Sequence, residues 1–314
     1  MSSPAVPESL YTSSTIVEFP GDWQVKRMLQ PQEPFDYTTP NRPALAGWFK
    51  NKIWCVYRHG YKINSLYYTT AEHSEAFSPE KEILGCSTLQ GPALVVFNDI
   101  LYCVFTNSND SNRLYYTVFI NDDWTKPLRL RGYSSAQSPA LAVFNGKLWC
   151  VHTGSQKDQN LYCTTFNGNA WSSDQKLSNH ASAAGPALAA SASTLLCVHR
   201  GADNDESLWY TTSDGSAWKP DRQIAVGIVG NKLYSGGDGP ALAYDPASNT
   251  FGLVYKGQDS ENDTLLYYTV AGSSDWAFPS RLHTFNSLAG PALIAYPTGP
   301  QNKFMVMFRG VKQS

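Results

Sequence analysis

The tripeptide Pro-Ala-Leu occurs six times in this chain of 314 residues, at nearly regular intervals. Its prolines are Pro43, Pro92, Pro139, Pro186, Pro240 and Pro291. The successive intervals are 49, 47, 47, 54 and 51 residues. A period of roughly 20–50 residues is typical of repeat proteins, in which each unit is one small supersecondary structure that packs on its neighbours. The chain is therefore predicted to fold as six similar units.

Each unit carries the signals of four short strands. In the third unit an apolar segment at 140–144 is followed by Asn145-Gly146, a pair that favours a tight hairpin, and by a second apolar segment at 148–152. A polar loop at 153–160 leads to a third strand at 161–166 and then to a fourth at 170–177. Short strands separated by turn signals indicate an all-β fold. In the fourth unit 22 residues separate Trp218 from the next anchor proline, against 15 in four other units, which predicts an insertion within 227–237.

The two ends of the chain share one unit. After Pro291 the sequence supplies only strands one and two, whereas residues 9–14 match a third strand and residues 22–29 match a fourth. A closed ring explains this division, because pairing the terminal strands in one sheet latches the circle. We therefore predict a six-bladed β-propeller of four-stranded antiparallel blades, in a single domain that spans 1–314. Its sixth blade is predicted to combine residues 290–311 with roughly 9–29.

Composition narrows the class of function. Charged residues make up 16% of the chain, the net charge is −2, and no long run of Lys or Arg occurs. Nucleic acid is therefore not expected as a partner, because phosphate binding requires a basic surface. The sequence contains neither a run of 18 apolar residues nor the pattern of a signal peptide, so we expect no membrane insertion. The expected location is the cytoplasm, or outside the cell after release without a signal peptide.

The six cysteines are predicted to be free thiols. Four of them recur at one repeat position inside apolar segments: Cys55, Cys103, Cys150 and Cys197. Equivalent positions in neighbouring units are usually too far apart for a disulfide, so these residues are expected to pack as small apolar side chains. Cys86 and Cys163 are expected to be free as well. No Cys-x-x-Cys pair occurs, and neither a metal nor a cofactor is predicted.

Candidate ligand-binding residues gather where strand two meets its polar loop and where strand three follows. They are Tyr57, Arg58, Tyr67, Tyr115, His152, Asp158, Tyr162, His199, Arg200, Asp205, Trp209, Tyr255, Lys256, Tyr267 and Arg309. In a propeller these loops share one face. An aromatic ring, a cation or imidazole and a carboxylate or amide form a suitable set for sugars, because the ring packs on C–H groups while the polar groups bind hydroxyls. Repetition around the ring predicts several glycan sites.

Structural roles remain open for the same residues. Loop Asp residues form turns, strand-three aromatics pack between blades, and two histidines at one repeat position can be satisfied by the backbone. The arginines can pair with loop carboxylates. An enzyme of the sialidase-like glycosidase class would need one asymmetric carboxylate cluster, which we do not find, so no enzyme activity is predicted. A protein-interaction platform, which would carry a large exposed apolar patch, stays as a further alternative.

The repeat resembles that of the six-bladed fungal and bacterial β-propeller lectins, of which the fucose-binding fungal lectins have a similar length. The resemblance rests on strand two, a polar loop, strand three and an Asn-Gly turn with a Trp three residues later, as in "FNGNAW" at 166–171. It implies a multivalent lectin with glycans or glycoconjugates as partners, and it leaves the oligomeric state open. The family's fucose pattern has an Arg in strand two and a Glu in strand three. Here strand three has no Glu, and only Arg58, Arg200 and Arg309 correspond in part, so fucose specificity is not implied.

Overall fold

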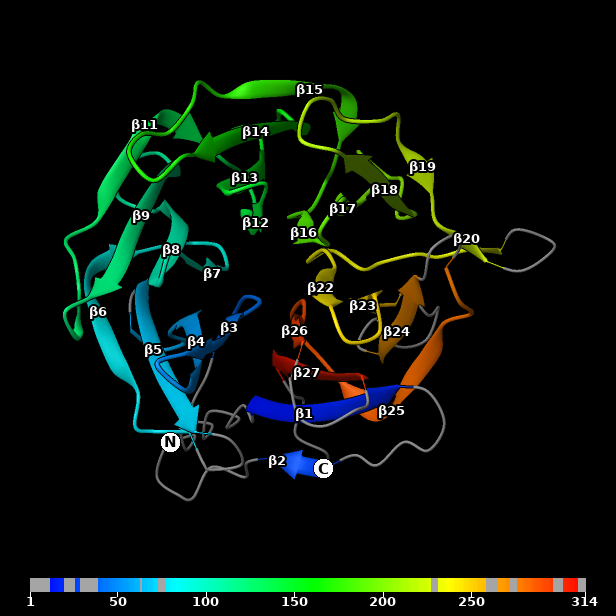
Figure 1. The fold of residues 1–314 in the computed structure, drawn as a ribbon, viewed down its shortest axis with the longest axis horizontal. Helices are drawn as coiled ribbons and strands as arrows, with labels where there is room; N and C mark the ends of the chain where they lie inside the picture. The colour runs from blue at the N-terminus through cyan, green and yellow to red at the C-terminus, as the bar shows by residue number, and fades with distance from the viewer. Residues whose placement is uncertain are drawn as a thin grey trace, which may run out of the picture.

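The computed structural model describes residues 12–19, 26–28, 39–62, 64–72, 77–226, 231–257, 265–271, 276–295 and 302–309. In this part of the chain the regular secondary structure consists of β-strands, and Figure 1 shows them arranged as a ring of small sheets around a central axis. No helix long and apolar enough to cross a membrane occurs among these residues.

Blades 1 to 3 follow one another along the chain, and each runs from an inner to an outer strand. The strands of blade 1 are β3 (Ala44–Phe49), β4 (Lys52–Arg58), β5 (Ser65–Glu72) and β6 (Lys81–Ser87). Those of blade 2 are β7 (Ala93–Phe97), β8 (Ile100–Asn107), β9 (Arg113–Ile120), β10 (Asp123–Trp124) and β11 (Leu128–Ser134). Those of blade 3 are β12 (Ala140–Phe144), β13 (Lys147–Thr153), β14 (Asn160–Phe166) and β15 (Gln175–Ala181).

Blades 4 and 5 repeat the pattern, and blade 6 joins the two ends of the chain. The strands of blade 4 are β16 (Ala187–Ala190), β17 (Leu195–Arg200), β18 (Leu208–Ser213) and β19 (Arg222–Gln223). A two-stranded sheet follows, made of β20 (Ala225–Val226) and β21 (Asn231–Lys232). The strands of blade 5 are β22 (Ala241–Asp245), β23 (Thr250–Lys256), β24 (Leu265–Ala271) and β25 (Ser280–Asn286). Those of blade 6 are β26 (Ala292–Ala295), β27 (Asn302–Arg309), β1 (Thr12–Phe19) and β2 (Lys26–Met28).

The innermost strands close the ring. Each of β3, β7, β12, β16, β22 and β26 contacts the inner strand of the blade before it and of the blade after it. In blade 6, β1 pairs antiparallel with β27 along its whole length, from Thr12 opposite Arg309 to Phe19 opposite Asn302. The predicted propeller, its six blades and the blade shared by both termini are therefore confirmed.

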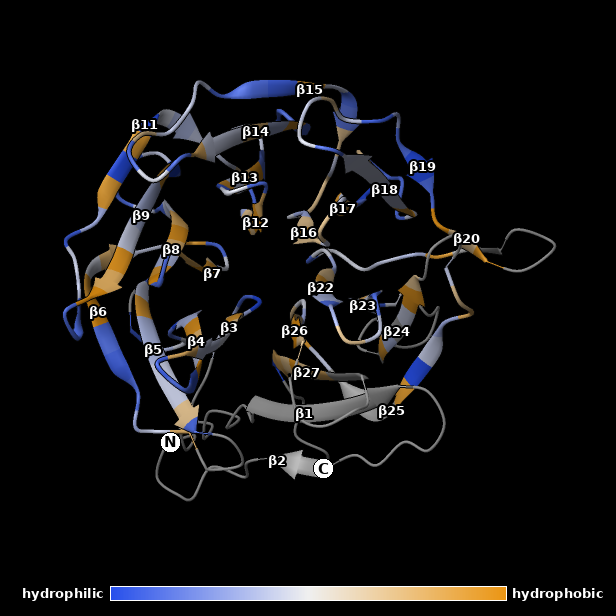
Figure 2. Ribbon diagram, in the orientation of Figure 1, coloured by the Kyte–Doolittle hydropathy of each residue, from blue (hydrophilic) through white to orange (hydrophobic). Residues whose placement is uncertain are grey.

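The core lies between neighbouring blades because successive strand residues face opposite sides. Leu148 and Cys150 of β13 pack on blade 2, while Trp149 and Val151 pack on blade 4. Figure 2 shows the opposite character in the outer strands β15 and β19, which are hydrophilic. All six cysteines are buried and free, as predicted, and burial raises the pKa of the Cys86 thiol to about 12.

Strand four carries an irregularity at one repeated place. In blade 3 the pairing shifts between Tyr162–Lys176 and Asn160–Ala181, and blades 1, 2 and 5 shift at the same register. In blade 4 Trp209 pairs with Gln223, whereas Ser207 pairs with Tyr234. The additional residues of this blade, including the β20–β21 pair, therefore lie at the bulge that the other blades share. Residues 227–230, the first part of the predicted insertion, lie outside the described residues.

A buried hydroxyl closes each connector between blades. These residues are Thr39, Thr88, Ser135, Ser182, Ser235 and Ser287. Each of them donates to a carbonyl one or two residues further on, as Ser135 Oγ does to Gln137 O at 2.8 Å and Ser182 Oγ to Ala184 O at 2.7 Å. Such side-chain hydrogen bonds stabilise a turn whose backbone N–H and C=O groups have no partner in a β-sheet. These hydrogen bonds therefore fix the geometry of the connectors, which place the anchor prolines near the axis.

Candidate functional site

Within each blade the structure brings a strand-two residue beside a strand-three aromatic. Tyr57 pairs across the strands with Tyr67, and Tyr255 pairs with Tyr267. The other two such pairs among the predicted residues are His152 with Tyr162 and His199 with Trp209. These pairs lie at the ends of the strands that the strand-two to strand-three loops connect. The predicted residues therefore recur at equivalent places around the ring.

The strand-two members of these pairs are buried. His152 and His199 are each 1% exposed, and Tyr57 and Tyr255 are each 3% exposed. Burial also raises the pKa of the Tyr255 phenol. Side chains enclosed in this way do not reach a ligand on the surface, so the prediction that these four residues contact one is not supported by their positions.

Both histidines have partners for both ring nitrogens. The Nδ1 atom of His152 lies 2.7 Å from Thr153 O, and its Nε2 atom lies 3.2 Å from a carboxylate oxygen of Asp174. His199 repeats the arrangement, with Nδ1 3.0 Å from Arg200 O and Nε2 3.1 Å from Asp221. These imidazoles join the end of strand two to the start of strand four. In blade 1 the carboxylate of Glu80 takes the place of Asp174 and Asp221. It accepts a hydrogen bond from the Tyr57 hydroxyl and lies 3.0 Å from His59 Nε2.

The loop carboxylates organise their own loops. Asp158 accepts from the backbone N–H of Asn160 at 3.0 Å and from the Tyr162 hydroxyl at 2.8 Å. Asp205 accepts in the same way from the backbone N–H of Ser207 and from Trp209 Nε1. Each carboxylate therefore closes a turn and fixes the aromatic side chain that follows it, which is the turn-forming role of Asp.

The strand-three aromatics remain partly accessible. Tyr67, Tyr115, Tyr162, Trp209 and Tyr267 are all of intermediate burial. In blades 3 and 5 the strand-two neighbour stacks on the ring: the planes of His152 and Tyr162 are nearly parallel at 16°, and those of Tyr255 and Tyr267 at 19°. Their polar atoms are directed by acceptors, such as Asp110 for the Tyr115 hydroxyl at 2.9 Å. These five side chains are the predicted site residues best placed to meet a ligand.

The predicted cations occupy one position in four consecutive blades, from blade 4 through blade 6 to blade 1. Arg200 pairs with Glu206 at 3.1 Å and Lys256 pairs with Asp238 at 3.5 Å. Arg58 instead donates to neutral groups, including the amide oxygens of Asn41 at 3.0 Å and Asn64 at 2.8 Å.

Within the described ranges, the Nε atoms of Arg58, Arg200 and Arg309 are buried without a hydrogen-bond partner. Burial lowers the pKa of Arg58 and Arg309; for Arg309 the charge of Asp238 opposes this change. Of the arginines for which carboxylate pairing was considered from the sequence, Arg200 has such a partner and Arg58 binds amides; Lys256, for which no pairing was considered, has one as well.

Arg42, which the sequence analysis did not select, lies at the centre of the ring. It is 8% exposed, and its guanidinium donates to the carbonyl oxygens of Pro139 at 2.9 Å, Pro186 at 3.1 Å and Pro240 at 3.2 Å. A cavity of 90 Å³ lies beside it on the axis, lined by the six Pro-Ala-Leu tripeptides. Burial lowers the pKa of Arg42 to about 10, against the opposing influence of Asp238.

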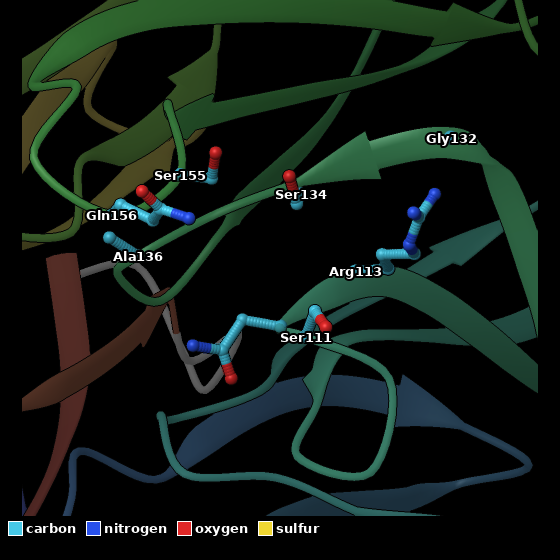
Figure 3. Close-up of a pocket in the computed structure, with 8 residues that line it drawn as sticks. Ser111, Arg113, Gly132, Ser134, Ala136, Ser155 and Gln156 are labelled. Atoms are coloured by element: carbon cyan, nitrogen blue, oxygen red, sulfur yellow. The ribbon is translucent and has the colours of Figure 1, made fainter.

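A polar cleft opens between blades 2 and 3, and the sequence analysis did not identify it either. The blade 2–3 cleft has a volume of 420 Å³ and is lined by the strand-two to strand-three loops of both blades and by the outer strand β11. Figure 3 shows amide, hydroxyl and guanidinium groups around it. Its polar lining residues are Ser111, Asn112, Arg113, Ser134, Ser155 and Gln156. Among the described residues no group of three or more His, Cys, Asp or Glu side chains is placed to hold a metal ion.

With its ring of six antiparallel blades, the chain has the fold of the six-bladed β-propeller lectins. No family model and no curated protein sequence matches it, but solved structures do. A triple mutant of AofleA from Arthrobotrys oligospora superposes with a TM-score of 0.64 at 10% identity, covering 95% of this chain and 87% of that one. The Aleuria aurantia lectin in complex with Fucα1-6GlcNAc gives 0.65 at 12% identity, covering 88% and 90%.

A protein of unknown function from Dyadobacter fermentans is also similar, with a TM-score of 0.57 at 11% identity over 86% of this chain and 94% of that one. At this level of identity the likeness defines the fold, and the ligand has to be argued from the residues of this chain.

Proposed function

We propose that this protein is a carbohydrate-binding lectin that holds glycans at several places on the loop-rich face of its propeller and catalyses no reaction. One observation carries the proposal: five blades present a partly buried aromatic side chain at the same position, and acceptors within the blade orient several of these side chains. A fixed ring face beside hydroxyl and carboxylate groups suits the C–H and O–H groups of a sugar. Similarity in fold to fucose-binding lectins supports the same class of ligand.

Several weak sites on one rigid ring would act together. A glycan-coated surface offers many ligands at once, so that each bound site raises the effective concentration for the next. The proposal therefore expects weak binding of single sugars and much stronger binding to clustered ones. The arrangement of the site residues does not favour a glycosidase, because the carboxylates of Asp158 and Asp205 already accept hydrogen bonds from their own loop and from the strand-three aromatic that follows it.

A glycan array combined with a haemagglutination assay tests the proposal. We expect binding to a defined set of glycans and agglutination that a soluble competing glycan reverses. The double variant Tyr162→Ala/Trp209→Ala should lose most of this binding while keeping the melting temperature near that of the wild type. Phe278→Ala is the matched control, because Phe278 is 64% exposed and follows strand three, at the other end of the blade. Failure to bind any glycan, or turnover of fluorogenic glycosides, would overturn the proposal.

A further inference from the structure

The blade 2–3 cleft is open because its side chains do not meet across the gap. Asn112 lies on the blade 2 side and Gln156 on the blade 3 side, and neither side chain has a hydrogen-bond partner among the described residues. The backbone of the loops is nevertheless well defined, since Ala136 N donates to Gly154 O at 2.8 Å just beside the opening. Figure 3 shows the Gln156 amide among the polar groups around this space, and Asn112 lines the same cleft.

The equivalent gaps on either side are closed by side-chain hydrogen bonds. Between blades 1 and 2, Asn109, at the position of Gln156, donates from Nδ2 to Ser87 Oγ at 2.8 Å. Between blades 3 and 4, Gln159, at the position of Asn112, accepts from Asp203 N at 2.7 Å. The backbone does not cause the difference, because Gln156 and Asp203 adopt the same left-handed conformation, with φ of 56° and 52°. The residue types alone therefore leave one gap open.

Arg113 gives the open cleft a charge that the equivalent positions lack. The residues in its place are Asn160 in blade 3 and Ser207 in blade 4, both neutral. Its Nε atom lies 3.5 Å from Asp110, whose carboxylate also accepts from the Tyr115 hydroxyl. Its Nη1 atom lies 3.8 Å from where a side chain at Gly132 would begin, and Gly132 lines the cleft. The terminal nitrogens thus stay close to the cleft while Asp110 holds the inner end of the guanidinium.

We infer that the blade 2–3 cleft is an additional ligand site, separate from the strand-three aromatics, and that it binds the carboxylate-bearing residue of an acidic glycan. This inference rests on the proposed lectin function and specifies its ligand. Arg113 pairs with the sugar carboxylate, because a guanidinium matches a carboxylate with two parallel donors. The amides of Asn112 and Gln156 and the serine hydroxyls bind the sugar hydroxyls. The volume of 420 Å³ falls within the range of roughly 300–1,000 Å³ that is typical of small-molecule sites.

Calorimetric titration of the full chain tests the inference. The probes are sialyllactose and methyl glucuronoside, which carry the carboxylate on different sugars, with lactose and methyl glucoside as their neutral counterparts. We expect at least one acidic probe to bind at one site per chain, at least tenfold more tightly than its neutral counterpart. Arg113→Gln should remove this preference, and Arg222→Gln, an exposed arginine on β19, should leave it unchanged.

A second variant closes the cleft without touching Arg113. Asn112→Gln installs the side chain that in blade 3 accepts from the backbone N–H of Asp203, and by accepting from Gln156 N it should abolish acidic-sugar binding while the melting temperature stays close to the wild-type value. Acidic-sugar binding that survives this closure would overturn the inference, as would equal displacement by inorganic sulfate. Binding of neutral glycans alone, unaffected by Arg113→Gln, would overturn it while leaving the lectin proposal intact. No binding to any glycan would overturn both.

Discussion

Replacing Arg42 should loosen the centre of the ring. Its guanidinium bonds to the carbonyl oxygens of three anchor prolines, Pro139, Pro186 and Pro240, which begin blades 3, 4 and 5. Arg42 itself precedes blade 1, so that one side chain connects four blades at the axis. In Arg42→Met these three buried carbonyls lose their donor, whereas the apolar volume of the side chain is largely kept.

The size of the effect follows from two opposing contributions. Hydrogen bonds to a charged group stabilise by about 1.5–3 kcal/mol each, which for three bonds is about 4.5–9 kcal/mol. Removing the arginine also removes the cost of burying its charge. The fall of its pKa from 12.5 to about 10, at about 1.36 kcal/mol per unit, puts that cost near 3 kcal/mol. We therefore expect Arg42→Met to lower the free energy of unfolding by about 1–6 kcal/mol.

Urea unfolding followed by tryptophan fluorescence measures this change, since the chain contains nine tryptophans. Arg42→Lys should lose part of the stability, because it keeps the charge but has a single ammonium for three carbonyls. Arg222→Met is the control, and as an exposed substitution it should stay within about 0.5 kcal/mol of the wild type. An Arg42→Met protein that unfolds at the same urea concentration as this control would refute the role of Arg42 in joining the blades.

Three further predictions concern the interior and one exposed turn. The six buried thiols should react with a thiol reagent only after unfolding, and stoichiometric labelling of the native protein would contradict their burial. Asp221→Ala should lower the free energy of unfolding by about 2–4 kcal/mol, because it leaves His199 and His180 without their shared carboxylate; urea unfolding checks this, and a loss below 1 kcal/mol would speak against the pairing. Hydrogen bonds from Ser216 and Ala217 lower the pKa of Asp214 to about 2, so its stabilising effect should be complete above pH 3.8 and be lost as the pH falls toward 2; an NMR titration of its carboxyl group with a midpoint near 3.8 would contradict this.

The architecture was predictable from the sequence because the strand and turn signals of each unit lie close together in the chain. The anchor Pro139, the Asn145-Gly146 turn and the alternation of apolar residues define one hairpin, and the same signals return in the other units. The closing blade followed from counting strands at the two ends. Such information is carried by residues near one another in the chain, so it needs no knowledge of three-dimensional contacts.

The role of the histidines required contacts across the blade. His152 and His199 end strand two, and the carboxylates that bind them, Asp174 and Asp221, start strand four. A signal was present, because these carboxylates follow the strand-four tryptophan by three residues. Blades 2 and 5, which have no histidine at this strand-two position, have Pro127 and Pro279 there, whereas blade 1 combines Tyr57 with Glu80. The two positions are 22 residues apart in the chain, and without their contact the repeat pattern favoured a ligand-binding role for the histidines.

Arg42 and the blade 2–3 cleft depend on breaks in the repeat. Arg42 precedes its anchor proline, at a position where the other units have Gly or Ser. From the sequence alone a cation at this position is expected to lie on the surface. The structure shows instead that it donates hydrogen bonds to three carbonyl groups that are distant in the chain. The cleft arises from Asn112 and Gln156, ordinary loop residues whose significance appears only when they are compared with the bridged pairs in neighbouring blades.

The pairing of β1 with β27 also determines when this protein can finish folding during synthesis. Thr12 pairs with Arg309, so β1 can pair with β27 only after β27 has been synthesised. Blades 1 to 5 are contiguous in the chain and can form one after another as the ribosome releases them. Until residue 309 has left the exit tunnel, β1 can pair only with β2, its edge toward β27 stays open, and blade 5 has an uncovered face. The growing chain therefore carries an open strand edge throughout translation, and an unpaired edge is a site for aggregation or for binding a chaperone.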